Sequence, residues 1–135
     1  MASTTVLPDT DVTTEWTPSA GTDHFELVNE VIPGDDSEYI EAIDDPADSE
    51  QLVDEFRFTG IAEGFSSAVK THIRYELGDA TSIIQVDYIL DGVIRQTYNI
   101  TGVSGVKLNQ LTALTAAHYS SERINAGSLR LTFIP

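Results

Sequence analysis

The chain contains no cysteine among its 135 residues. Disulfide bonds, zinc–thiolate sites, CxxC redox motifs and cysteine nucleophiles are therefore excluded together. Basic residues are scarce: seven Lys and Arg stand against 22 Asp and Glu, which gives a formal net charge of −15. Such a charge argues against a surface that holds nucleic acid or anionic lipid. We therefore expect no nucleic acid and no membrane among the partners.

Long apolar runs are missing as well. No stretch approaches the ~18 consecutive apolar residues of a membrane span. The opening of the chain also lacks the basic start and the apolar run of a signal peptide. The length fits one domain of roughly 100–200 residues, and an apolar content of 41% is enough for one core. We expect a soluble domain that packing alone stabilises.

The charge is concentrated in the first part of the chain. Residues 1–55 hold 16 acids and no Lys or Arg, whereas residues 56–135 hold six acids and seven bases. A block of like charge is typical of a solvated segment. Here apolar residues interrupt it, and the spacing of Phe25, Leu27 and Val31 predicts a strand inside the acidic region.

The first residues are mostly Ser, Thr, Asp and Pro. This composition predicts an extended acidic N-terminal arm over residues 1–19, followed by a β domain over residues 20–135. Apolar anchors on such an arm can become ordered on a partner protein. The arm carries four candidate anchors: Val6, Leu7, Val12 and Trp16.

Short segments with period-two alternation follow one another from Phe56 onward. In the clearest, from Val69 to Leu77, apolar and polar residues alternate, which predicts a strand with one core face and one wet face. A second such segment runs from Ser128 to Ile134. Turn residues separate these segments at the spacing of a sandwich or barrel, so we expect an all-β fold.

Asp91-Gly92 joins two apolar runs and predicts a hairpin with a two-residue type I′ turn. In the first strand, Ile83 and Ile89 share a face with polar residues, so we expect that face to be partly covered and to form a subunit contact. The other face of the first strand holds Ile84, Val86, Tyr88 and Leu90. In the second strand, one face holds Ile94, Gln96, Tyr98 and Ile100, and the other holds Val93, Arg95, Thr97 and Asn99.

One short helix is expected near the C-terminus, over residues 114–124. Thr115 is a candidate N-cap, and Leu114 and Tyr119 have the spacing of a hydrophobic staple. The glycine at position 127 can close the helix in the left-handed conformation.

No catalytic, metal-binding or cofactor-binding residue emerges from the motifs. The three histidines have no HxH, HxxxH or HExxH spacing, and the acidic clusters at residues 35–38 and 44–48 lack a calcium-loop register. With 22 acids, pairing two carboxylates for glycoside hydrolysis has no specificity. Trp16 fits either a sugar-stacking residue or, more simply, a core plug. We therefore expect a protein that is not an enzyme.

Two stretches carry a family resemblance. The first runs from Trp16 through His24 and Val28-Asn29-Glu30 to Tyr39-Ile40, in the pattern W…G…H…V-[DN]-E…P-x-D-D-x-x-Y-[IV]. The second joins Leu114-Thr115-Ala116-Ala117 to a final segment of the form L-R-[LV]-x-[FL]. Together they resemble small jelly-roll-like structural proteins of tailed bacteriophages, over about a third of the chain.

The resemblance implies a jelly-roll-like antiparallel β-sandwich and a role as a virion component. Family members include capsid cement or decoration proteins on the outside of the particle, and modules of tail fibres. We therefore expect a cement protein on the capsid exterior, assembled in the host bacterial cytoplasm, with the major capsid protein and copies of itself, as a homotrimer, for partners. The alternative is a carbohydrate-binding or tail-fibre module that contacts the host surface.

Overall fold

A computed structural model describes residues 7–27, 39–42, 51–58, 65–66, 69–79, 81–102, 104–114, 119–120 and 126–135 of the chain. Its largest element is a five-stranded antiparallel sheet. The strand order is β1 (Thr10–Thr14), β4 (Leu52–Arg57), β11 (Ser128–Ile134), β7 (Ile83–Leu90) and β8 (Val93–Ile100). Most of the described residues lie in strands, so the expectation of a mainly β chain is confirmed.

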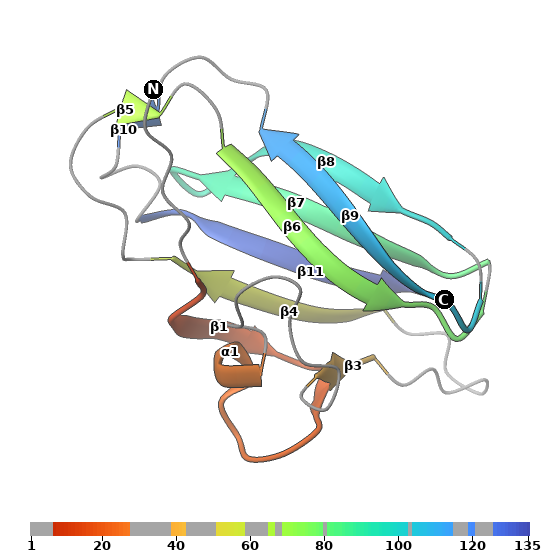
Figure 1. Cartoon of the computed structure of the whole chain (residues 1–135). Coiled ribbons are helices and arrows are strands. Elements are labelled where there is room, and N and C mark those ends of the chain that lie inside the picture. Colours follow the sequence, from red (N-terminus) through yellow and green to blue (C-terminus); the bar gives the residue numbers. More distant parts are fainter. Residues whose placement is uncertain are drawn as a thin grey trace.

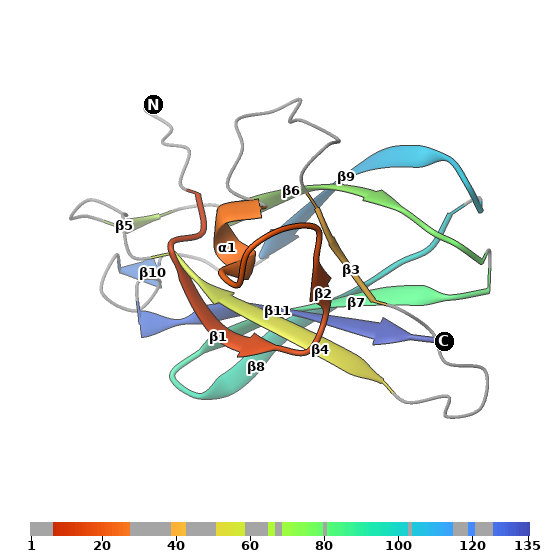
Figure 2. The ribbon, with the colours of Figure 1, turned by 90° about the horizontal axis from the view of Figure 1, so that it is seen from below.

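The described residues also form three smaller antiparallel pairs. They are β6 (Val69–Glu76) with β9 (Lys107–Leu114), β2 (Thr17–Pro18) with β3 (Ile40–Glu41), and β5 (Phe65–Ser66) with β10 (Tyr119–Ser120). The β6–β9 pair lies over one face of the five-stranded sheet (Figure 1). On another side of the molecule, β1, β2, β3 and the four-residue helix α1 (His24–Leu27) lie together (Figure 1 and Figure 2).

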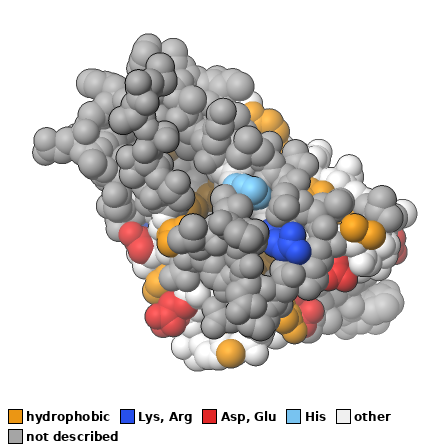
Figure 3. All heavy atoms as spheres, viewed as in Figure 1, with side chains coloured by type: hydrophobic (Ala, Val, Ile, Leu, Met, Phe, Trp, Pro, Cys, Tyr) orange, Lys and Arg blue, Asp and Glu red, His pale blue; other side chains and the backbone are white. Residues whose placement is uncertain are grey.

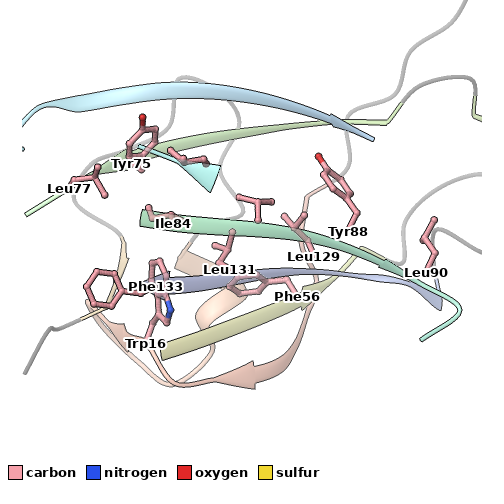
Figure 4. Close-up of a cluster of buried hydrophobic side chains, with 12 residues drawn as sticks. Trp16, Phe56, Tyr75, Leu77, Ile84, Tyr88, Leu90, Leu129, Leu131 and Phe133 are labelled. Atoms are coloured by element: carbon pink, nitrogen blue, oxygen red, sulfur yellow. The ribbon is translucent and has the colours of Figure 1, made fainter. Parts of the chain in front are cut away.

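The core lies between the β6–β9 pair and the sheet. Every second residue of β7 and β11, and of β6 from Thr71 onward, is turned toward it, as the alternation in the sequence predicts. Figure 4 shows Tyr75 and Leu77, from β6 and the residue after it, approaching side chains of the larger sheet. The buried cluster consists of Trp16, Phe56, Tyr75, Leu77, Ile84, Val86, Tyr88, Leu90, Ile100, Leu129, Leu131 and Phe133.

Two tyrosine hydroxyls link the two layers. The Tyr75 hydroxyl donates a hydrogen bond to the carbonyl oxygen of Thr101 (3.0 Å), and the Tyr88 hydroxyl donates one to the Thr71 hydroxyl. A buried tyrosine needs a partner for its hydroxyl group. These bonds satisfy that need and hold β6 over β7 and the end of β8.

The predicted hairpin is confirmed. Asp91 and Gly92 have φ values of 56° and 73°, and the strands β7 and β8 pair on either side of them. A type I′ turn needs positive φ at both central residues, which Asp and Gly tolerate better than other residue types. The local sequence therefore determines this connection.

A bulge in β8 alters the predicted face of one residue. Tyr88 pairs with Gln96 but Ile89 pairs with Ile94, so Arg95 is an extra residue on β8. An extra residue reverses the alternation beyond it. Ile94 therefore lies beside Ile89, on the face turned away from the core, and not on the face of Gln96, Tyr98 and Ile100 with which alternation groups it.

The structure places part of the expected N-terminal arm inside the β domain. β1 is an edge strand of the sheet, paired with β4, and Trp16 lies in the core with 9% exposure. Local composition misses this because β4, which supplies the pairing, lies about 40 residues later in the chain. Residues 1–6, with Val6, lie outside the described residues.

Two predicted elements differ from the structure. Phe25 and Leu27 lie in α1, not in a strand, because the Asp11 carboxylate accepts hydrogen bonds from the first N–H groups of the helix. In the predicted C-terminal helix, Leu114 ends β9 and Tyr119–Ser120 form β10, so the helix is wrong at these positions. The rest of its span, residues 115–118 and 121–124, lies outside the described residues.

The turn can be tested with two glycines. We expect Gly92→Ala to lower the free energy of unfolding by about 1–2 kcal/mol, because an L-residue pays roughly that amount for the left-handed conformation. Gly78→Ala is the matched control, since a new Cβ meets no atom within 4 Å at either position and Gly78 has no positive φ. Urea unfolding of both variants measures the difference, and equal effects would contradict the turn assignment.

Packing of the central strand gives a second test. Leu131 is buried between β4 and β7, so Leu131→Ala should lower the free energy of unfolding by about 2–5 kcal/mol. Val106, which is 45% exposed, provides a control in Val106→Ala, with an expected change within about 0.5 kcal/mol. A loss below about 1 kcal/mol for Leu131→Ala, also measured by urea unfolding, would show that β11 is not central to the core.

Candidate functional site

Asp54 is a fully buried carboxylate on the core side of β4. Its Oδ1 atom accepts hydrogen bonds from the backbone N–H groups of Glu15 (2.7 Å) and Trp16 (2.8 Å), and its Oδ2 atom lies 2.5 Å from Nδ1 of His24. A buried carboxylate is costly unless donors surround it. All three donors come from the chain N-terminal to β4, so Asp54 fastens that segment to the sheet.

Further hydrogen bonds hold the same segment. Asp11 accepts from the N–H groups of His24 and Phe25, at 2.8 Å each. Glu15 accepts from the N–H of Val53 (2.9 Å). The Trp16 indole donates to the carbonyl oxygen of Leu52 (3.0 Å). We call this set the N-terminal clasp: Asp11, Glu15, Trp16, His24 and Asp54.

A histidine beside a carboxylate is also the arrangement that orients a catalytic base. A general base must come within hydrogen-bond reach of a substrate proton. His24 is only 4% exposed and lines neither of the two recesses described below. The His24–Asp54 pair therefore acts as part of the clasp, by holding α1 against β4.

The clasp supports an acidic end of the molecule. Residues 7–27 and 39–42 contain no Lys or Arg, and we call their acids the acidic end: Asp9, Asp11, Glu15, Asp23, Glu26 and Glu41. An open recess of about 420 Å³ lies here, lined by residues 20–23, 26 and 27. Among the described side chains in view, Figure 3 shows acidic groups at separate places on one face of the molecule and a Lys or Arg group near its centre.

A second buried carboxylate lies on the opposite face of the sheet. Asp87 accepts hydrogen bonds from the Thr97 hydroxyl (2.6 Å) and from Nη2 (3.0 Å) and Nε (3.3 Å) of Arg130. Its side chain is 2% exposed, against 31% for Arg130. Glu55 is the neighbour of Arg130 on β4, so one row of side chains crosses the sheet: Glu55, Arg130, Asp87 and Thr97. We call the face that carries this row the outer face.

The predicted partner-binding residues fall in different places. Leu7 is half-buried, and Val12 is the extra residue of a bulge in β1, with 44% exposure. Trp16 is part of the hydrophobic core, which confirms the simpler of its two interpretations. Its ring is therefore not available to stack on a sugar. Ile83 and Ile89 are half-buried on the outer face, and Ile94 joins them through the bulge in β8.

A second recess, of about 270 Å³, lies beside the loop that follows β6. In this loop the backbone N–H of Thr81 and then its hydroxyl donate to Asp79, which lowers the pKa of the Asp79 carboxyl below its ordinary value of 3.8. Because the folded pKa is depressed, any stability from these bonds is present above the ordinary pKa and is lost as the pH falls through the folded pKa. Asp79 is exposed, so this contribution is small.

Sequence reasoning missed His24, Asp54 and Asp87. A signal was present for Asp54, because it alternates with Leu52 and Phe56 on the apolar side of a strand, where an acid must have partners. For Asp87 the signal was its place between Gln85 and Ile89 on the second face of β7. Neither position identifies the partner, since the partners lie far away in the sequence.

In the part of the chain that the structure describes, no group of three or more His, Asp or Glu side chains is placed to hold a metal ion. No described helix has the length and apolarity to cross a bilayer.

Removing the central acceptor tests the clasp. Asp54→Ala should lower the free energy of unfolding by about 3–5 kcal/mol, because it leaves His24 and two backbone N–H groups buried without their acceptor. Glu76→Ala removes an exposed carboxylate from β6 and should change stability by less than about 0.5 kcal/mol. Chemical denaturation of both proteins measures these values, and similar losses would show that Asp54 is not an anchor.

Comparison of the chain with protein-family models, with curated proteins and with solved structures finds no match. The likeness to phage structural proteins therefore depends on the residues of the two stretches quoted above.

Proposed function

We propose that the chain is a structural protein of a tailed-bacteriophage particle, most specifically a cement protein that binds the outside of the major capsid lattice. The observation that carries this proposal is the acidic end, which the N-terminal clasp fastens to the sheet. A charged surface on a rigid support favours binding to a surface of complementary charge and shape. In this role the chain performs no covalent chemistry.

The sign of the charge supports a place outside the shell. A chain with a net charge of −15 is repelled by packaged DNA and attracted to basic patches of a protein lattice. Identical weak contacts repeated over a lattice add up through multivalency, so no single contact must be strong.

The finer fold belongs to the same proposal. The β6–β9 pair over the five-stranded sheet is compatible with a jelly-roll-like sandwich, in which two antiparallel layers enclose one core. Strand β11, the last in the chain, lies at the centre of the five-stranded sheet. This order is compatible with a fold in which long connections join neighbouring strands.

The carbohydrate-binding alternative loses its main support. It relied on Trp16 and the tyrosines as stacking platforms. Trp16, Tyr75 and Tyr88 are buried, and Tyr98 is half-buried. Of the described aromatic side chains, only Tyr39 is largely exposed, and one ring is a weak platform for a sugar.

The experiment uses particles of the phage that encodes the chain. We expect mass spectrometry to find the chain in gradient-purified particles, and protease added to intact particles to remove it without releasing DNA. Absence of the chain from the particles, or its release only together with DNA, would contradict the proposal.

Charge variants then test the acidic end. The purified chain is added back to particles that lack it. Glu26→Lys should weaken binding about fivefold, which is ~1 kcal/mol, because it opposes the proposed contact with a basic surface. Glu76→Lys makes the same charge change on β6 and should have a smaller effect. Equal weakening by both variants would show that net charge matters and the acidic end does not.

A further inference from the structure

The second recess joins a carboxylate and a hydroxyl group to an apolar wall. Its lining residues come from three separate segments of the chain: Ala42 after β3, Gly78, Asp79 and Ser82 in the loop between β6 and β7, and Phe133 in β11. β6 and β11 finish at the same end of the molecule (Figure 1). The volume of about 270 Å³ lies just below the ~300 Å³ at which pockets for drug-sized ligands begin, so the recess suits a small group.

Hydrogen bonds hold the loop that forms one side of this recess. The Ser104 hydroxyl donates to the carbonyl oxygen of Gly78 (2.8 Å). Further along the loop, the N–H of Ser82 donates to the carbonyl oxygen of Asp79 (3.2 Å). The polar groups of the recess are therefore in place before a ligand arrives, which lowers the cost of binding.

Ser82 has a hydroxyl group without a partner. The residue is only 5% exposed, and in the part of the chain that the structure describes its hydroxyl group forms no hydrogen bond. Every fully buried polar side-chain atom of the described residues does have a partner. The Ser82 hydroxyl therefore belongs to the small exposed part of the residue, which lines the recess. Such a group is left unsatisfied unless a ligand or water bonds to it.

Asp79 contributes a negative charge without a counter-ion. Its Oδ1 atom accepts from the N–H (2.8 Å) and the hydroxyl (2.9 Å) of Thr81. These bonds lower the pKa of the Asp79 carboxyl, so it is ionised at neutral pH. Among the described residues no Lys or Arg pairs with it. On a chain with a net charge of −15, such a carboxylate attracts a cation and repels an anion.

The number of free acceptor sites distinguishes two kinds of organic cation. A carboxylate oxygen has about two lone pairs, and Thr81 uses both of those on Oδ1. A guanidinium group binds a carboxylate best through two parallel hydrogen bonds, one to each oxygen. Asp79 offers only Oδ2, which suits the compact charge of an ammonium group. The other ammonium hydrogens are then available to the Ser82 hydroxyl and to water.

We propose that this recess binds a primary ammonium group carried on an aliphatic stem, which is the chemistry of a lysine side chain. The ammonium group donates to Oδ2 of Asp79 and to the Ser82 hydroxyl. The stem lies against Ala42 and Phe133, the apolar residues of the lining. Lysine side chains bury their methylene groups along apolar surface in this way while the charged end stays near water. The proposal does not rest on the proposed function, because it requires only the purified chain and a small amine.

Titration of the purified full chain with butylammonium, followed by ¹H–¹⁵N NMR, tests the ligand chemistry. We expect saturable shifts of the backbone amides of Thr81 and Ser82, with a dissociation constant in the millimolar range, because the ion pair is exposed. Butylguanidinium at the same ionic strength should bind at least about threefold more weakly, because it finds one acceptor oxygen in place of two. Methylammonium, which lacks the stem, should also bind at least about threefold more weakly.

Variants assign the binding to the recess. Asp79→Asn keeps an oxygen that accepts from Thr81 but removes the charge, so it should raise the dissociation constant at least about fivefold. Glu76→Gln is the matched control, because it removes the same charge from an exposed position on β6 and should change the constant less than about twofold. Ser82→Ala should weaken binding about twofold or more. Its hydroxyl bonds to no described residue, so the fold should be unaffected, which circular dichroism checks.

A further ligand distinguishes two sources of the ammonium group. Nα-acetyl-lysine N-methylamide carries the group on a peptide unit. Binding as tight as that of butylammonium supports a lysine side chain of a partner protein as the ligand. Binding of butylammonium alone supports a small free amine.

Three results would overturn the proposal. They are the absence of saturable shifts at the recess, binding of butylguanidinium or methylammonium as tight as that of butylammonium, and equal weakening by Asp79→Asn and Glu76→Gln. These results stay distinct from the capsid experiment, because no particles are present. A chain that binds butylammonium but is absent from particles would contradict the proposed function alone.

Discussion

The fold depends on the way one buried carboxylate is satisfied. Asp54 has no contact with solvent, and its acceptor atoms are used by His24 and by the backbone of Glu15 and Trp16. A buried charge without these donors would cost several kcal/mol, so β4 can keep its place in the core only while residues 15–24 stay folded against it. The acidic N-terminal segment and the sheet are therefore coupled, although the segment has little apolar surface of its own.

Two adjacent residues of β11 show how polar groups fix the register. Leu131 lies opposite Asp54 on the core side, and Arg130 lies opposite Asp87 on the outer side. A slip of one residue would place the leucine beside Asp87 and the arginine in the core. The first change leaves the buried Asp87 carboxylate without Arg130, and the second buries a guanidinium group among apolar side chains. Either change is far more costly than the loss of a few apolar contacts. Polar groups on both faces of the sheet therefore fix the position of its central strand.

Local patterns in the sequence predict the elements whose structure is decided locally. Alternation identifies the core residues of β6, β7 and β11, and Asp91-Gly92 identifies the turn, because each depends on neighbours a few positions away. The segment around Phe25 is helical because Asp11, from another element, accepts its first N–H groups. Ile94 changes face because of a bulge that no periodicity reveals. The clasp also depends on residues that lie far apart in the sequence. Composition alone therefore predicts an arm over residues 1–19.

Native-state hydrogen exchange of the Glu15 and Trp16 amides tests the coupling between the clasp and the sheet most directly. If Asp54 ties the segment to the core, both amides should exchange only through global unfolding, with the same free energy and the same dependence on urea as the amides of β11. Exchange of Glu15 and Trp16 through a local opening that urea does not affect, while β11 stays protected, would contradict the account.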